Sequence, residues 1–480
     1  MRLRGLARET LVYAIGNAGL RAGAFLLIPL YTHTLPMQEY GLLATLLLTM
    51  QVLGIIMGLG VRTAFMRFCA EFAEKGQLGR LLGSAYALVA AGGVAVTAVA
   101  MTLLKPLFAA VLHTAQPGPF VLLVCMAALA QTLWMLTVSY FRARNKGSAF
   151  VALNGVVFLL LASSTVLFLL QLHAGLKGVL WAYVVSYGLM WVVVSLVIAR
   201  ITGLAVDQPT MRRLVRFGFP LIFAMSGDLA LDSSALYAMS VFSGLEEVAV
   251  YSLGFKIAQI AVITLILPFQ LAYEPAVYGV LDSPFLRRFI GEALIHLLLA
   301  FGFVAMGIVF VFRDLIHVVA PAEYGAGYGV AFALLPGVAC IGLQYVGESL
   351  LFLRGKTRVS AAIVSGVTVA SIGLNVWLIR LWGMHAAVLV YDVAHVAIGV
   401  LLLAVGMRCV PIQLHGRRLA WTVALFLGGT ALIWAASHLP AGFFYPLAAL
   451  AIFATFYGAR ELGIVDLRMW QKKELAEHAA

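Results

Sequence analysis

The chain has 480 residues, of which 63% are hydrophobic and only 11% are charged. A soluble chain of this length is typically about a quarter charged, so this composition excludes a soluble enzyme and a receptor with a large external domain. The continuous apolar runs exclude an outer-membrane barrel, whose strands alternate apolar and polar residues. The net charge of +12 favours contact with anionic lipid headgroups, and we expect no nucleic-acid partner.

Fourteen apolar runs follow one another along the chain, and a helix of about 20 such residues can cross a bilayer. They cover residues 10–33, 40–61, 81–103, 118–140, 148–171, 177–199, 215–239, 248–271, 290–312, 326–350, 358–379, 384–407, 419–437 and 442–459. The first run resembles a signal peptide, but no exported soluble domain follows it. We therefore expect an all-α protein with 14 spans, the first of them uncleaved.

The basic residues predict the orientation, because Lys and Arg are retained on the cytoplasmic side during insertion. All but six of the 32 Lys and Arg residues fall in one alternating set of segments, which includes both ends of the chain. The opposite set contains only Lys105, Lys177, Arg313 and Arg380. Both termini are therefore predicted to be cytoplasmic.

A turn-rich, basic seam near residues 200–216 divides the spans into six before it and eight after it. The two halves resemble each other weakly, as in transporters with internal repeats, which place the substrate site between the halves. We expect one lobe at 1–205, a second at 206–410, and two further spans with a cytoplasmic tail at 411–480.

Short motifs in both halves carry a family resemblance. They are Leu35-Pro36, Glu39-Tyr40-Gly41-Leu42, Gly58-Leu59-Gly60 and Arg67, then Phe217-Gly218-Phe219-Pro220 and the stretch 247–258. The chain resembles the polysaccharide-transporter (Wzx-type flippase) family of the MOP superfamily, which is related to the MATE transporters. Where many relatives carry an Asp-Arg pair late in the seventh span, this chain has Ala235-Leu236, with Asp232 one turn earlier.

The resemblance implies a two-lobed carrier in the bacterial inner membrane, without enzymatic activity. Its substrate would be an undecaprenyl-pyrophosphate-linked sugar repeat unit, moved from the cytoplasmic to the periplasmic leaflet by alternating access. The product would enter O-antigen (lipopolysaccharide) or exopolysaccharide biosynthesis, with a polysaccharide polymerase, glycosyltransferases and the membrane lipids as partners.

Charged residues inside spans are costly and usually face the bundle interior or a wet cavity. Arg21 lies near the middle of the first span, and Asn17 is its polar neighbour one turn away. A guanidinium without a partner on its own helix suits a pyrophosphate, which it can bind with two hydrogen bonds. The alternative is a salt bridge between the lobes, for example to Asp228.

A second set of intramembrane charges consists of Asp228 and Asp232 in span seven, Lys256 in span eight and Asp392 in span twelve. The two Asp residues of span seven are spaced i,i+4 and share a face, and the helix rise places Asp232, Lys256 and Asp392 at a similar depth. We expect Lys256 to contact substrate and the carboxylates to pair with charge or couple an ion. A purely structural Asp232–Lys256 ion pair is the alternative.

Several functions can be weighed against the flippase. Gly355-Lys356-Thr357 matches only the end of a phosphate-binding loop, and no metal-ligand motif occurs, so we expect no cofactor or metal. A lipid II flippase and a MATE-type drug antiporter are the alternatives among transporters. A membrane polymerase or ligase would need a larger external loop than the segments near 104–117 and 313–325.

Overall fold

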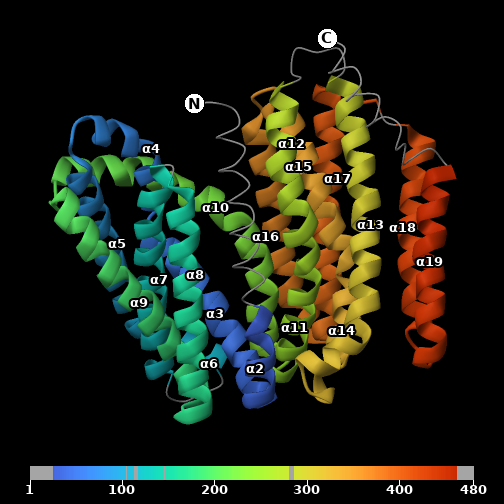
Figure 1. Ribbon diagram of the computed structural model, residues 1–480, viewed down its shortest axis with the longest axis horizontal. Coiled ribbons are helices and arrows are strands. Elements are labelled where there is room, and N and C mark those ends of the chain that lie inside the picture. The colour runs from blue at the N-terminus through green and yellow to red at the C-terminus, as the bar shows by residue number, and fades with distance from the viewer. Residues whose placement is uncertain are drawn as a thin grey trace. The chain divides into compact units, whose positions relative to one another are not determined.

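The computed structural model describes residues 25–103, 105–112, 117–144, 146–279, 286–413 and 415–461. Every element of secondary structure in these ranges is a helix (Figure 1), which confirms the predicted all-α class. The α-helices are α2 Ile28–Thr34, α3 Met37–Gly58, α4 Val61–Glu74, α5 Leu78–Thr102, α6 Lys105–Leu112, α7 Gly118–Ala143, α8 Gly147–Val166, α9 Gly175–Thr202, α10 Gln208–Phe242, α11 Leu245–Ala261, α12 Leu267–Gly279, α13 Leu286–Val319, α14 Ala326–Ala333, α15 Leu335–Phe352, α16 Thr357–Trp382, α17 Met384–Cys409, α18 Gly416–Ala436 and α19 Ala441–Glu461. The π-helical segments η1 Leu167–Gln171 and η2 Val262–Ile266 continue α8 and α11, and the 3₁₀ turn η3 is Ala322–Tyr324.

Twelve helical segments within the described ranges are long and apolar enough to cross a membrane. They coincide, within a few residues, with twelve of the fourteen predicted spans, from Met37–Gly58 to Ala441–Glu461. Most of the first predicted span, 10–33, lies outside the described residues. The seventh, 215–239, is helical within α10, where Leu229–Phe242 forms a shorter apolar helical segment. The count of fourteen and the cytoplasmic termini therefore stay predictions.

The helices pack into two compact units. Unit 1 is Met1–Ala249 with Val319–Pro321 and Ile372–Ala387, and unit 2 is Val250–Val318 with Ala322–Ser371 and Val388–Ala480. These units are defined by which helices contact one another. The predicted boundaries at 205 and 410 instead come from the internal repeat along the sequence. The predicted three-part division stays a prediction.

Helix α7 forms the middle of unit 1, where it packs against α3, α5, α8 and α9 (Figure 1). Its Trp134 is fully buried and donates its indole N–H to Asn154 on α8, with 3.2 Å between Nε1 and Oδ1. Aromatic side chains of α4, among them Phe65 and Phe68, enter the same hydrophobic core. The amphipathic helix α4 is thereby fixed to the spanning helices of unit 1.

Helix α15 has a similar place in unit 2, between α13 and α17. Gly347 on α15 lies against the backbone of Leu402 on α17, and Gly342 lies against Leu297 on α13. Small residues at such contacts let membrane helices approach closely. The last two helices, α18 and α19, pair with each other and reach α13 through Phe426, whose ring meets Phe301 edge-on at 5.6 Å.

Candidate functional site

An open cavity of about 590 Å³ lies within unit 1. Four helices line it, and its polar wall consists of Gln51 from α3, Arg62 and Thr63 from α4, Gln131 and Thr132 from α7, and Asp232 from α10. Ligand sites in proteins commonly have volumes of about 300–1,000 Å³ and a few polar groups that fix the ligand's orientation. The size and the lining make this cavity the candidate site.

A sharp turn places Arg62 at the cavity. Helix α3 ends at Gly58, and the next two residues, Leu59 and Gly60, both have left-handed backbone angles, with φ values of 48° and 66°. Gly60 lies so close to α10 that a Cβ there would be 2.1 Å from the carbonyl oxygen of Gly218. Because glycine adopts positive φ at little cost and has no side chain, it permits both the turn and the contact. Helix α4 therefore begins directly beside α10, and Arg62 is its second residue.

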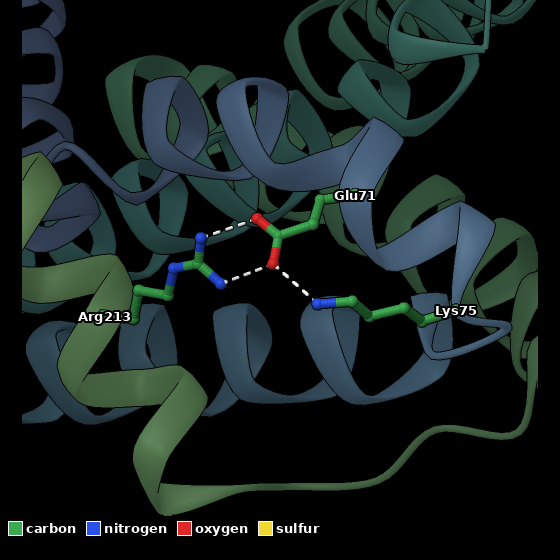
Figure 2. Close-up of polar contacts among 3 residues, drawn as sticks. All are labelled: Glu71, Lys75 and Arg213. Atoms are coloured by element: carbon green, nitrogen blue, oxygen red, sulfur yellow. Dashed lines mark hydrogen bonds and ion pairs between the residues drawn. The ribbon is translucent and has the colours of Figure 1, made fainter.

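Helix α4 is held against α10 by a polar and aromatic contact. Figure 2 shows Arg213 of α10 binding both carboxylate oxygens of Glu71, at 2.8 and 2.6 Å, while Lys75 binds the same carboxylate at 3.0 Å. The Arg213 guanidinium also lies 4.2 Å from the centre of the Phe68 ring. The hydrogen bonds from Arg213, and then those from Lys75, lower the pKa of Glu71 to about 2. We name Glu71, Lys75, Arg213 and Phe68 the α4 clamp.

The N-terminal end of α10 is fixed as well. Asp207 caps the helix by accepting a hydrogen bond from the backbone N–H of Thr210 at 3.0 Å, and its own N–H donates to the Ser84 hydroxyl of α5 at 2.9 Å. The hydrogen bonds from Thr210 lower the pKa of the Asp207 carboxyl. Such caps satisfy backbone donors that a helix leaves unpaired at its first turn.

Hydrogen bonds also join the helices that line the cavity to one another. Thr45 and Thr49 of α3 hydrogen-bond with Ser240 and Tyr237 of α10, each at 2.9 Å. Thr132 of α7 donates to the carbonyl of Gly54 on α3 at 3.4 Å. The walls of the cavity are therefore cross-linked to one another within unit 1.

The two charged residues of the lining, Arg62 of α4 and Asp232 of α10, lie apart along the cavity. Gly218 touches Gly60, two residues before Arg62, and Asp232 lies fourteen residues further along α10. At 1.5 Å per residue this corresponds to about 21 Å of helix. The cavity therefore presents a cation near the start of α4, a carboxylate deeper along α10, and uncharged amides and hydroxyls from α3 and α7.

The sequence-predicted site residues are distributed as follows. Asn17 and Arg21 lie outside the described residues, and of Asp228 the structure describes only its place in α10. Asp232 is partly buried in the wall of the unit 1 cavity. Lys256 on α11 and Asp392 on α17 belong to unit 2, and the Asp392 carboxylate accepts the backbone N–H of Gly337 at 2.9 Å. The expected contacts of these charges with substrate or ions stay predictions.

Sequence reasoning does not select Arg62, Gln51 and Gln131 as site residues. Arg62 falls among the loop cations that set orientation, and the two glutamines lie in apolar runs without any charge. The available signal is Gly58-Leu59-Gly60, a glycine-rich turn that ends two residues before Arg62. Among the described residues no group of three or more His, Cys, Asp or Glu side chains could hold a metal ion.

The comparisons with known proteins concern most of the chain. A family model described as "Polysaccharide biosynthesis protein" matches residues 6–278. No curated protein matches the sequence significantly. The lipid II flippase MurJ in an inward closed conformation superposes with a TM-score of 0.72 and 12% sequence identity, over 94% of this chain and 99% of that chain.

Two further solved structures are similar. An inward-facing multidrug resistance MATE family transporter of the MOP superfamily gives a TM-score of 0.60 at 15% identity, over 85% of this chain and 95% of that chain. A MOP superfamily transporter from Pyrococcus furiosus gives 0.58 at 14% identity, over 84% of this chain and 95% of that chain. At these identities the likeness shows the fold, which is that of the MOP superfamily.

Proposed function

The chain belongs to the polysaccharide biosynthesis protein family, and on this premise we propose that it is a lipid-linked oligosaccharide flippase. Its substrate is an isoprenoid carrier, undecaprenyl pyrophosphate, bearing a sugar repeat unit. The protein moves this substrate from the cytoplasmic to the periplasmic leaflet of the bacterial inner membrane, for O-antigen or exopolysaccharide assembly. The family membership confirms the resemblance that the short motifs indicate.

The observation that supports this proposal most is the group of polar side chains that line the unit 1 cavity. Polar side chains within a membrane helix bundle usually face a wet cavity and mark a substrate pathway, and two glutamines, two threonines and an arginine line this one. Amide and hydroxyl groups donate and accept hydrogen bonds, so they can pair with sugar hydroxyls. Arg62 adds a cation that suits a phosphate.

Transport by alternating access requires that this cavity open to one leaflet at a time. In the proposed cycle the sugar enters the cavity from the end near Arg62 while the isoprenoid stays in lipid. Arg21 and Asn17 bind the pyrophosphate, and Lys256 also contacts the substrate. Asp228, Asp232 and Asp392 neutralise these cations or couple transport to an ion gradient.

Lipid II transport is the second candidate function, because the superposition on MurJ extends over 94% of this chain, against 85% for the MATE transporter. Lipid II also joins an isoprenoid pyrophosphate to a sugar, so the same cavity chemistry applies. The two candidates differ in the sugar and in the pathway that each would restore.

Deletion of the gene in its native host tests the proposal, with surface polysaccharide and growth as separate readouts. We expect loss of surface polysaccharide with normal cell-wall growth, and restoration by the wild-type gene. Arg21→Ala, checked for normal membrane level by immunoblot, should fail to restore it. Loss of viability with lysis would favour lipid II transport, and intact polysaccharide together with normal growth would refute both candidates.

A further inference from the structure

We propose that an open groove between α5 and α10 binds an anionic phospholipid of the surrounding membrane, and that Arg212 and Arg216 recognise its phosphate. The groove has a volume of about 420 Å³ and shares no lining residue with the unit 1 cavity. The ligand is a structural lipid, so this site does not depend on the proposed transport substrate.

Two kinds of side chain line the groove. Arg212 and Arg216 of α10 are exposed and are spaced i,i+4, so they lie on one face of the helix. Leu88 of α5 and Met211 and Val215 of α10 are half-buried and apolar. Two cations beside an apolar surface suit a molecule with a phosphate at one end and acyl chains at the other. Basic pockets between membrane helices bind anionic lipid headgroups in this way.

The two arginines have no partner within the described part of the chain, where neither forms a hydrogen bond or an ion pair. Arg213, which lies between them in the sequence, points to Glu71 and binds it (Figure 2). Like charges at i,i+4 on a helix repel each other. A phosphate that bridges the two guanidinium groups would remove this repulsion and accept charge-assisted hydrogen bonds from both.

The carboxylates that contact the first turns of α10 are already occupied. Glu71 is bound by Arg213 and Lys75. Asp207 caps the helix by accepting hydrogen bonds from the backbone N–H and the hydroxyl of Thr210. Neither carboxylate lines the groove. The groove therefore has two positive charges and no carboxylate among its lining residues, which favours an anion from outside the chain.

Close contacts between α5 and the segment before α10 fix the shape of the groove. Gly83 of α5 lies against the backbone of Ala205, where an added Cβ would be 2.4 Å from the carbonyl oxygen. The next residue on α5, Ser84, accepts the N–H of Asp207 at 2.9 Å. Leu88 follows one turn later and lines the groove. Because these contacts hold the two helices together, little reorganisation is needed when a lipid binds.

The predicted spans place the groove where lipid headgroups meet acyl chains. The seventh predicted span begins at residue 215, so Arg212 and Arg216 lie at its start. Leu88 lies seven residues after the start of the third predicted span at residue 81, which corresponds to about 10 Å of helix. The arginines are therefore at the depth of a phosphate, and the apolar side of the groove extends toward the acyl chains.

The test measures binding of phosphatidylglycerol to the purified full-length protein in a neutral detergent by native mass spectrometry. We expect Arg212→Gln and Arg216→Gln each to weaken binding of the first lipid about tenfold, the loss expected when a hydrogen bond to a charged group is removed. Arg212→Lys should keep part of the affinity because it keeps the charge. Arg200→Gln is the matched control and should bind as the wild type does, because Arg200 is exposed at the end of α9 and does not line the groove.

Phosphatidylcholine separates recognition of the charge from contact with the acyl chains, because it has no net charge. It should bind more weakly than phosphatidylglycerol to the wild type, and with equal affinity to every variant. Equal affinity of the wild type for the two lipids would overturn the proposal, and so would equal binding of phosphatidylglycerol by the wild type and both glutamine variants.

Thermal melting gives a second readout of the same site. Both arginines are exposed, so the double variant Arg212→Gln, Arg216→Gln should melt at the wild-type temperature in lipid-free detergent. Added phosphatidylglycerol should raise the melting temperature of the wild type, because a ligand that binds the folded state stabilises it. The double variant should lose this rise, and an equal rise in both proteins would count against the groove.

Undecaprenyl pyrophosphate also carries anionic phosphate oxygens, so it is added as a competitor. We expect it to leave phosphatidylglycerol bound and to bind equally to the wild type and Arg212→Gln. Displacement of phosphatidylglycerol, together with weaker binding of the carrier by Arg212→Gln, would assign the groove to the carrier and overturn the phospholipid proposal. Transport is a separate readout, since a wild-type protein that moves no lipid-linked sugar but prefers phosphatidylglycerol would refute the proposed function and support the groove.

Discussion

Replacing Gly60 by alanine tests the structural basis of the candidate site most specifically. Gly60 has φ of 66°, and a Cβ on it would lie 2.1 Å from the carbonyl oxygen of Gly218, 2.6 Å from its carbonyl carbon and 2.8 Å from its Cα. All three are backbone atoms, so no side-chain rotation can relieve the overlap. The start of α4 must move away from α10, and Arg62 must move with it.

The magnitude has two parts. The left-handed conformation costs a non-glycine residue about 1–2 kcal/mol. Forcing an extra methyl group into a packed contact costs about 1–3 kcal/mol more. The sum of about 2–5 kcal/mol is a large share of the stability of a typical domain, about 5–15 kcal/mol.

Gly76 is a matched control, because it follows the same helix, has φ of 67°, and a Cβ added to it would meet no atom within 4 Å. Gly76→Ala should therefore show the backbone cost alone. We expect the melting temperature of the purified protein to fall clearly further for Gly60→Ala than for Gly76→Ala. Equal melting temperatures for the two variants would refute the close approach of the α3–α4 turn to α10.

Three further outcomes are expected. Arg213 lowers the pKa of Glu71 to about 2 from a usual 4.5, so the stabilisation by this ion pair is fully present above pH 4.5. The difference in melting temperature between wild type and Arg213→Gln should therefore shrink as the pH falls from 4.5 to 2. A difference that does not change with pH would contradict the ion pair. Asn154→Leu leaves the buried Trp134 indole N–H unpaired and should cost about 1–2 kcal/mol in thermal stability, whereas an unchanged melting curve would count against this bond. Arg313→Gln removes hydrogen bonds to two carbonyls of the α18–α19 turn and should speed proteolysis there, while cleavage at the wild-type rate would show that the bonds do not hold the turn.

Much of the fold follows from the sequence because hydrophobic length is a strong signal in a membrane protein. Twelve predicted spans coincide with described helices, since each is a continuous apolar run with charged or turn residues at its ends. Helix α4 was not predicted because its apolar residues do not form a continuous apolar run. Phe65, Phe68 and Phe72 repeat with helical spacing and are separated by charged residues. Its packing against the core of unit 1 becomes evident only in three dimensions.

The candidate site was less accessible to sequence reasoning. A charge within an apolar run is visible, so Asp232 could be selected, and the structure places it in the cavity wall. Arg62 follows a span and looks like any other loop cation, because its place at the cavity depends on the contact between Gly60 and Gly218. Gln51 and Gln131 are single polar residues on different helices, and the sequence does not show that they line one cavity.

The most direct test of the proposed activity is reconstitution of the full-length protein in liposomes that contain a lipid-linked oligosaccharide from the native host. A membrane-impermeant glycosidase added outside reports the fraction of sugar that reaches the outer leaflet. We expect the wild-type protein to raise the cleaved fraction of the sugar from about half toward completion. The double variant Gln51→Leu, Gln131→Leu should slow this rise and still bind undecaprenyl pyrophosphate. A cleaved fraction that stays at half with correctly folded wild-type protein, under an imposed proton or sodium gradient as well as without one, would contradict the flippase proposal.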